Sequence, residues 1–166
     1  VFLLTLIIFE VDKKFDADRL RVGNKLKWHT VGVTIYSYIV VYTGALVRHT
    51  NSELVCLDWP FCDNSAIGLP TRFNEWVQMG HRFAAGLIFL WILYITIHAM
   101  RHYKDQKIIY WGWISAFLLV LGQVTTGALS IFTYLNLYVA LFHSLFISLL
   151  FGVLTYLILL VFRNRS

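Results

Sequence analysis

The sequence predicts an all-α, polytopic membrane protein built around a bundle of four transmembrane helices. It is 58% hydrophobic and 17% aromatic, with only 14% charged residues and a net charge of +5, which is a more apolar balance than soluble domains have. Four separate apolar stretches are each long enough to cross a hydrocarbon core, which takes about 20 helical residues. We therefore expect two antiparallel hairpins that pack together as a bundle.

A short apolar run, VFLLTLIIF, precedes the four spans. It is too short to cross a membrane, and it lacks the basic start and the small-residue cleavage site of a signal peptide. We expect residues 1–10 to be the end of a truncated transmembrane helix from a longer protein with further spans upstream. Residues 11–27 are then a cytoplasmic loop, and residues 28–166 form the four-helix domain.

Each of the four spans is bounded by charged residues or by interfacial aromatic residues, which gather where a membrane meets water. The first hairpin carries a long outer loop, at residues 48–75, and a basic turn joins the two hairpins. The expected spans are residues 28–47, 76–99, 108–131 and 137–162.

The basic residues predict the orientation of the bundle. Eleven of the 14 Lys and Arg residues precede the first span, join the second span to the third, or close the chain. By the positive-inside rule this side, with the C-terminus, is cytoplasmic, and the loop at residues 48–75 is extracytoplasmic. The same topology accounts for the net charge, so membrane lipid is the expected surrounding and no nucleic-acid partner is needed.

An internal repeat links the two expected hairpins. YTGALVRHT ends the first span and TTGALSIFT ends the third, and in both hairpins a histidine opens the returning helix, His81 in the first and His143 in the second. Gly, Ala and Thr are common wherever membrane helices touch, so the four shared residues alone are weak evidence for a duplication. The matching histidines strengthen the interpretation as duplicated hairpins.

The two histidines predict a heme site. Both lie on the order of 10 Å below the outer boundary, at about 1.5 Å per residue, on helices that run in the same direction. Two imidazoles at one depth can bind heme iron from its two faces. Ala84 and Ala85 follow His81 on its helix face and leave room for a flat macrocycle. The basic side chains near the outer ends that are placed to pair with heme propionates are Arg48, His49 and Arg82.

A plainer interpretation of the histidines stays open. A lone intramembrane histidine is often only hydrogen-bonded between helices. Ligation is favoured here because two ionisable groups recur at matching positions in apolar spans. His29, His98 and His102 lie near the cytoplasmic boundary, where water solvates them. A second heme between His29 and His98 is an alternative, although no glycine–alanine slot lies beside them.

The outer loop contains CLDWPFC, with the only two cysteines, Cys56 and Cys62. On the oxidising side of a membrane we expect them to form a disulfide, because a zinc site would need further Cys or His ligands nearby. Such a bond would hold the loop as a lid over the outer end of the bundle. A redox-active pair is the alternative.

Several motifs together resemble the C-terminal half of bacterial heme A synthase: YTGALVRHT, CLDWPFC, GLPTRFNEWVQMGHR and ALFHS. The resemblance covers essentially the whole chain. It implies an eight-helix plasma-membrane enzyme, made of two similar halves, that oxidises a methyl group of heme O to the formyl group of heme A for cytochrome oxidase assembly. It also implies a heme b between His81 and His143, the missing N-terminal half as a partner, heme O as substrate of the whole enzyme, and heme O synthase as a candidate partner.

In the resembling family the N-terminal half carries a Glu three residues before its own histidine. Here that position is Gln78, and an amide cannot accept a proton at neutral pH. Glu75 lies about a turn closer to water. We therefore expect this chain to be the cofactor half, with no catalytic residues and no activity alone, since a bis-histidine heme has no open coordination site and transfers electrons.

Two other functions share part of this pattern. A b-type electron-transfer membrane cytochrome would use the same two histidines but would not need the CLDWPFC loop. A non-heme membrane scaffold or transporter fragment would use them only for hydrogen bonds between helices. An upstream half with its own E-x-x-H would favour the synthase, and a low-spin b-type absorption spectrum would exclude the scaffold.

Overall fold

The structure is a computed structural model that describes residues 21–62 and 70–163. Within these ranges it is all-α, as the sequence predicts, and contains no strand. The prediction of a truncated helix at residues 1–10 and most of the loop predicted at residues 11–27 lie outside the described residues. The helices are α3 (Asn24–His49), α4 (Phe73–His102), α5 (Lys107–Phe132) and α6 (Leu137–Arg163).

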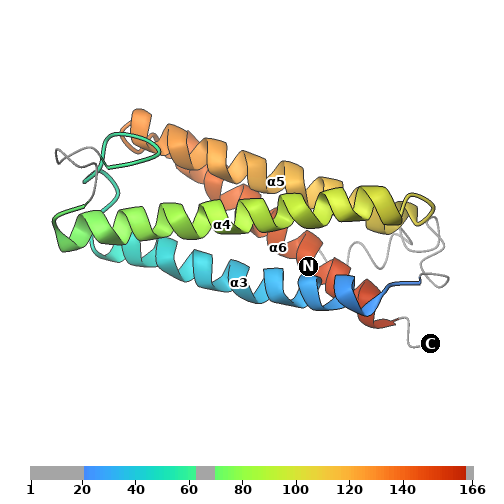
Figure 1. Ribbon diagram of the computed structural model, residues 1–166. Helices are drawn as coiled ribbons and strands as arrows, with labels where there is room; N and C mark the ends of the chain where they lie inside the picture. Colours follow the sequence, from blue (N-terminus) through green and yellow to red (C-terminus); the bar gives the residue numbers. More distant parts are fainter. Residues whose placement is uncertain (1–20, 63–69, 164–166) are drawn as a thin grey trace.

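The four helices form an antiparallel bundle (Figure 1). Sequence neighbours pack against each other, and α6 also packs against α3, which closes the ring. As a result α4 and α6 lie diagonally across the bundle. The α3–α4 and α5–α6 connections share one end, and the α4–α5 turn lies at the other end (Figure 1).

All four helices are long and apolar enough to cross a membrane, which fits a multi-pass membrane protein. The helices extend beyond several of the expected spans. α3 begins at Asn24 rather than at residue 28 and so includes Lys25 and Lys27, whose long side chains can reach water from a helix that outlasts the hydrocarbon core. α4 begins at Phe73 rather than at residue 76.

The first turn of α4 is capped by a buried carboxylate. Glu75 Oε2 accepts hydrogen bonds from the backbone N–H groups of Thr71 at 2.7 Å and of Arg72 at 3.1 Å. These donors have no partner inside a helix, and a negative charge at a helix N-terminus is stabilising. Glu75 therefore starts the helix that carries His81.

Most of the main hydrophobic core lies in the half of the bundle near the α4–α5 turn, although it extends along α3 as far as Val40. Trp113 of α5 is completely buried there, packed among aliphatic side chains of all four helices. In α4 the buried cluster begins at Ile88, and in α6 at Leu150. Both positions lie about two helical turns after the histidine of the same helix. On these two helices the histidines consequently lie outside the fully buried part of the core.

Candidate functional site

His81 and His143 lie on α4 and α6, the two diagonal helices, in the half of the bundle near the α3–α4 and α5–α6 connections. Both side chains are half-buried. The site is therefore built from two imidazoles that come from opposite corners of the bundle.

The first TGAL segment holds His81. Thr43 Oγ1 lies 2.9 Å from His81 Nδ1 and donates its own hydrogen to the carbonyl oxygen of Val40 at 2.7 Å. Gly44, the next residue, lies against the same ring, because a Cβ added there would be 3.0 Å from His81 Cε1. The first two residues of the TGAL segment in α3 thus contact the ring of the histidine in α4.

The second TGAL segment holds His143 in the same way. Thr126 Oγ1 lies 3.1 Å from His143 Nδ1 and donates to the carbonyl oxygen of Gly122 at 2.7 Å. A Cβ added to Gly127 would be 3.4 Å from His143 Cε1. The sequence predicted the repeat and the histidines but not this contact. The available signal was the matching position of the two TGAL segments, each of which lies in the last two turns of its helix.

The repeat continues to the ends of the two helices. The C-cap threonines, Thr50 and Thr133, each donate a side-chain hydrogen bond to the leucine carbonyl of their own TGAL segment, at 2.9 and 2.7 Å. The next residues, Asn51 and Tyr134, both adopt left-handed backbone with φ of 50° and 51°. In each hairpin a backbone hydrogen bond between residues five positions apart then closes the helix end. Ser52 N–H donates to Val47 O, and Leu135 N–H donates to Ser130 O.

The small residues beside His81 have two different surroundings. Ala84 and Ala85 are half-buried and pack against the main core. Gly80 and Gly86 are exposed, and a Cβ added to either would meet no atom within 4 Å. The glycines that closely approach the histidines are therefore those of the TGAL segments and not those adjacent to His81.

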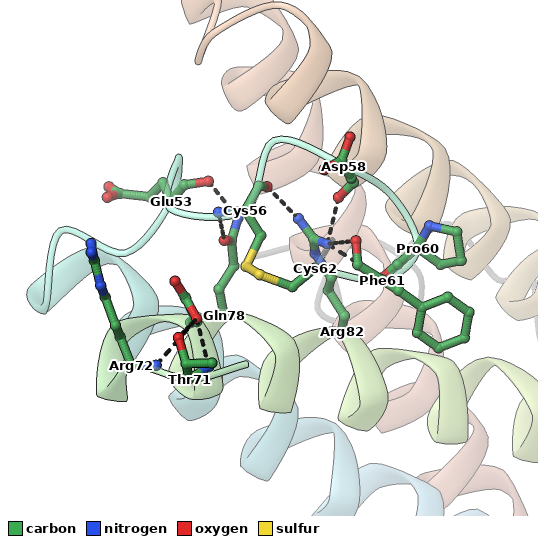
Figure 2. Close-up of a disulfide and its surroundings, with 11 residues drawn as sticks. Glu53, Cys56, Asp58, Pro60, Phe61, Cys62, Thr71, Arg72, Gln78 and Arg82 are labelled. Carbon is green, nitrogen blue, oxygen red and sulfur yellow. Dashed lines mark hydrogen bonds between the residues drawn. A yellow bond between two sulfur atoms is a disulfide. The ribbon is translucent and has the colours of Figure 1, made fainter. Parts of the chain in front are cut away.

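The loop between α3 and α4 is closed by the expected disulfide between Cys56 and Cys62, whose Cα atoms are 5.0 Å apart (Figure 2). Both cysteines are buried and form a small apolar cluster with Met79 of α4. The disulfide therefore lies directly on the first turns of α4, next to the segment that carries His81.

Gln78 fixes this loop to α4. Its side chain is buried, and its Oε1 accepts a hydrogen bond from the backbone N–H of Cys56 at 2.7 Å. Its Nε2 donates to the carbonyl oxygen of Glu53 at 2.6 Å. Figure 2 shows the amide reaching from the helix into the loop. The residue three positions before His81 thus has a structural task that its amide suits, since it needs both a donor and an acceptor.

Arg82 also reaches into the loop from α4 (Figure 2). Its Nη2 donates to the carbonyl oxygen of Cys56 at 2.8 Å, and its Nη1 donates to that of Asp58 at 2.7 Å. Longer contacts join Nη1 to the carbonyl oxygens of Pro60 and Phe61. Arg82 Nε is buried and has no hydrogen-bond partner among the described residues.

The other two basic residues expected at the outer end are exposed. Arg48 Nη1 forms an ion pair with Glu53 Oε1 at 2.8 Å, and His49 is exposed at the last position of α3. Arg48 therefore contacts the start of the loop, whereas Arg82 contacts the disulfide segment.

The remaining histidines contact neighbouring rings at the other end of the bundle. His29 Nδ1 accepts a hydrogen bond from Trp91 Nε1 at 3.2 Å. The rings of His98 and His102 stack with their centroids 4.4 Å apart. Within residues 21–62 and 70–163, no three or more His, Cys, Asp or Glu side chains come together as a site for a metal ion.

Comparison with known proteins identifies close relatives. The chain is 61% identical over 166 residues to the heme A synthase of Lysinibacillus sphaericus (strain C3-41), covering 99% of this chain and 54% of that relative. It is 61% identical over 165 residues to that of Geobacillus kaustophilus (strain HTA426), covering 99% and 52%. The heme A synthase of Macrococcus caseolyticus (strain JCSC5402) is 55% identical over 165 residues, covering 99% and 55%. The chain thus spans about half the length of these relatives.

A family model described as cytochrome oxidase assembly protein matches residues 1–155. This match includes the loop between α3 and α4, both TGAL segments and both histidines. The chain therefore belongs to the cytochrome oxidase assembly protein family.

Proposed function

We propose that this chain is the C-terminal, heme b-binding half of a heme A synthase. The observation that carries the proposal is the pair of half-buried histidines on diagonal helices, each with a threonine at its Nδ1 atom. Ionisable groups are costly within membrane spans, so a repeated and individually supported pair argues for use rather than accident. The relatives are heme A synthases, and they supply the enzyme class.

The surroundings of the histidines suit a heme. On α4 and α6 the buried core begins about two turns after the histidines, and Ala84 and Ala85 are small, half-buried residues one turn after His81. Arg82 Nε is a buried donor without a partner among the described residues, and it is the edge of the guanidinium that we assign to a propionate. Arg48 and His49, exposed at the same end of the bundle, are the other basic residues that we assign to the propionates.

The chemistry that follows is electron transfer. A heme bound by two imidazoles has no open coordination site and supplies a one-electron carrier. In this proposal the chain itself binds and orients the cofactor through His81 and His143, while the disulfide loop covers the outer end. Gln78 is committed to that loop, so no residue here is assigned a catalytic role, and the chain alone is inactive.

The whole enzyme would need the other half of the protein. We propose that the missing N-terminal half binds heme O and that its methyl group is oxidised there to the formyl group of heme A, with heme O synthase as the source of substrate. The excess of Lys and Arg on one side supports a bacterial plasma-membrane protein with a cytoplasmic C-terminus and an extracytoplasmic loop between α3 and α4.

Substitution of the two histidines tests cofactor binding. In detergent-purified protein carrying this chain, His81→Ala and His143→Ala should each abolish the low-spin b-type absorption spectrum. His102→Ala is the matched control, because this exposed histidine of α4 lies at the opposite end of the bundle, and it should leave the spectrum unchanged. A six-coordinate spectrum that persists in both alanine variants of the site would refute the assignment.

Restoring the upstream half tests the enzyme class. The chain joined to an upstream half from a relative should convert heme O to heme A in cells, and the chain alone should not. Conversion by the chain alone would overturn the division of roles between the halves.

A further inference from the structure

We propose that Thr43 and Thr126 are positioning residues that fix the protonation of the two histidines, with the proton on Nδ1 and the lone pair on Nε2. The inference rests on the proposed function in one respect, because heme iron is taken as the partner of Nε2. It assigns a task to the first residue of each TGAL segment, which the proposed function leaves without one.

The direction of the hydrogen bonds carries the argument. A threonine hydroxyl has one hydrogen to donate and two lone pairs. Thr43 donates that hydrogen to Val40 O, and Thr126 donates to Gly122 O, each at 2.7 Å. A backbone carbonyl can only accept, so each hydroxyl has only lone pairs left to offer. The histidine Nδ1 facing each hydroxyl must therefore be the donor, which places the proton on Nδ1.

The same argument applies at both rings. An unprotonated Nδ1 would place its lone pair against the remaining lone pairs of the threonine hydroxyl. The arrangement therefore selects one tautomer in both hairpins.

This tautomer is the one that a metal ligand needs at Nε2. A neutral imidazole binds metal through its unprotonated nitrogen, and a hydrogen bond from the other nitrogen fixes the ring and raises the basicity of the ligand. Gly44 and Gly127 complete the support, because they let α3 and α5 approach the rings closely. The two hairpins thus present their ligands already oriented.

The tautomer is measurable without heme. In the heme-free full-length protein with 15N-labelled histidine, the nitrogen chemical shifts of His81 and His143 should report protonated Nδ1 and unprotonated Nε2. A protonated Nε2 on either ring would overturn the proposal for that hairpin. This measurement uses the unmodified protein, so it does not depend on whether a variant folds.

Thr43→Val and Thr126→Val remove the hydroxyl with little change in shape, and Thr43→Ser and Thr126→Ser keep it. Loss of such an outer partner typically weakens binding about 10-fold to 100-fold. Each valine variant should therefore lose heme at least about tenfold more readily and show a higher heme midpoint potential, because a less basic imidazole favours the reduced iron. Each serine variant should behave as the unmodified protein.

The outcomes separate the two proposals. Valine variants that match the serine variants in heme retention and midpoint potential, while His81→Ala loses heme, would overturn the role of the threonines and leave the proposed function intact. Absence of a bis-histidine heme in the unmodified protein would overturn the proposed function, and the nitrogen shifts would still decide the tautomer.

Discussion

The two hairpins hold their histidines alike but differ completely in what covers them. In α3–α4 and in α5–α6 the same threonine, glycine and helix-end contacts recur at matching positions. In the first hairpin residues 50–62 contain a disulfide loop that is bonded to α4, whereas residues 133–136 make only a short turn in the second. The shared part is thus the support of the imidazole, and the loop is an addition to one hairpin.

The position three residues before each histidine shows how the addition is attached. In α4 it is Gln78, which bonds the loop at two points. In α6 it is Ala140, which has no loop to hold. A difference of one side chain at an equivalent position therefore marks the difference in architecture between the hairpins.

The largest expected effect comes from removing this attachment. Gln78→Ala deletes two buried hydrogen bonds and leaves the N–H of the buried Cys56 without its acceptor, so the free energy of unfolding should fall by about 2 to 4 kcal/mol. The Cys56–Cys62 disulfide should also become more readily reduced. Asn74→Ala, which removes one 3.3 Å bond from the same helix to Thr50 O, is the control and should cost less than about 1 kcal/mol. If the disulfide were reduced at the same rate in Gln78→Ala and in the unmodified protein, Gln78 would not hold the loop on α4.

A smaller effect should separate the two glycines of the repeats. A Cβ at Gly44 would lie 3.0 Å from the His81 ring, whereas one at Gly127 would lie 3.4 Å from the His143 ring. Gly44→Ala should therefore force a rigid ring to move and cost about 1 to 3 kcal/mol. Gly127→Ala should cost less, because its contact distance is ordinary. Thermal unfolding of both variants in detergent checks the order, and equal losses would show that the hairpins support their rings equally tightly.

The smallest effect concerns the left-handed residues after the two helices. Asn tolerates this backbone conformation, and a bulky residue such as Tyr pays roughly 1 kcal/mol more. Tyr134 is 70% exposed, so Tyr134→Asn should remove strain without losing much packing and stabilise the protein by about 1 kcal/mol. The reciprocal change, Asn51→Tyr, should destabilise it by a similar amount. A loss of stability in Tyr134→Asn would show that contacts of the Tyr134 ring stabilise the protein by more than the backbone strain costs.

The sequence predicted the helices well because hydropathy and length are local properties. The four spans follow from apolar runs of sufficient length, and only their ends differ, as at Asn24 and Phe73. Those ends depend on side chains that reach water and on the cap made by Glu75, which hydropathy does not measure. The disulfide followed from there being only two cysteines, close together in one loop.

The contacts of the site were less predictable because they join distant residues. Thr43 and His81 meet only because α3 and α4 pack with a particular rotation, which no local pattern specifies. Gln78 was interpreted by its missing carboxylate, and its bonds to residues 22 and 25 positions earlier in the chain could not be seen. Similarly, the glycines that closely approach the rings, Gly44 and Gly127, lie on the helices that precede the histidines, and no local pattern indicates this.

The order of the elements along the chain has a consequence for biogenesis. In each hairpin the helix that carries the threonine is synthesised before the helix that carries the histidine. A ribosome feeding this chain into a membrane therefore delivers the acceptor first, and the arriving imidazole can pair with it at once. An unpaired polar group in hydrocarbon costs several kcal/mol. Because the threonine is already in place, each hairpin can insert as a unit and its histidine needs no other protein as a hydrogen-bond partner.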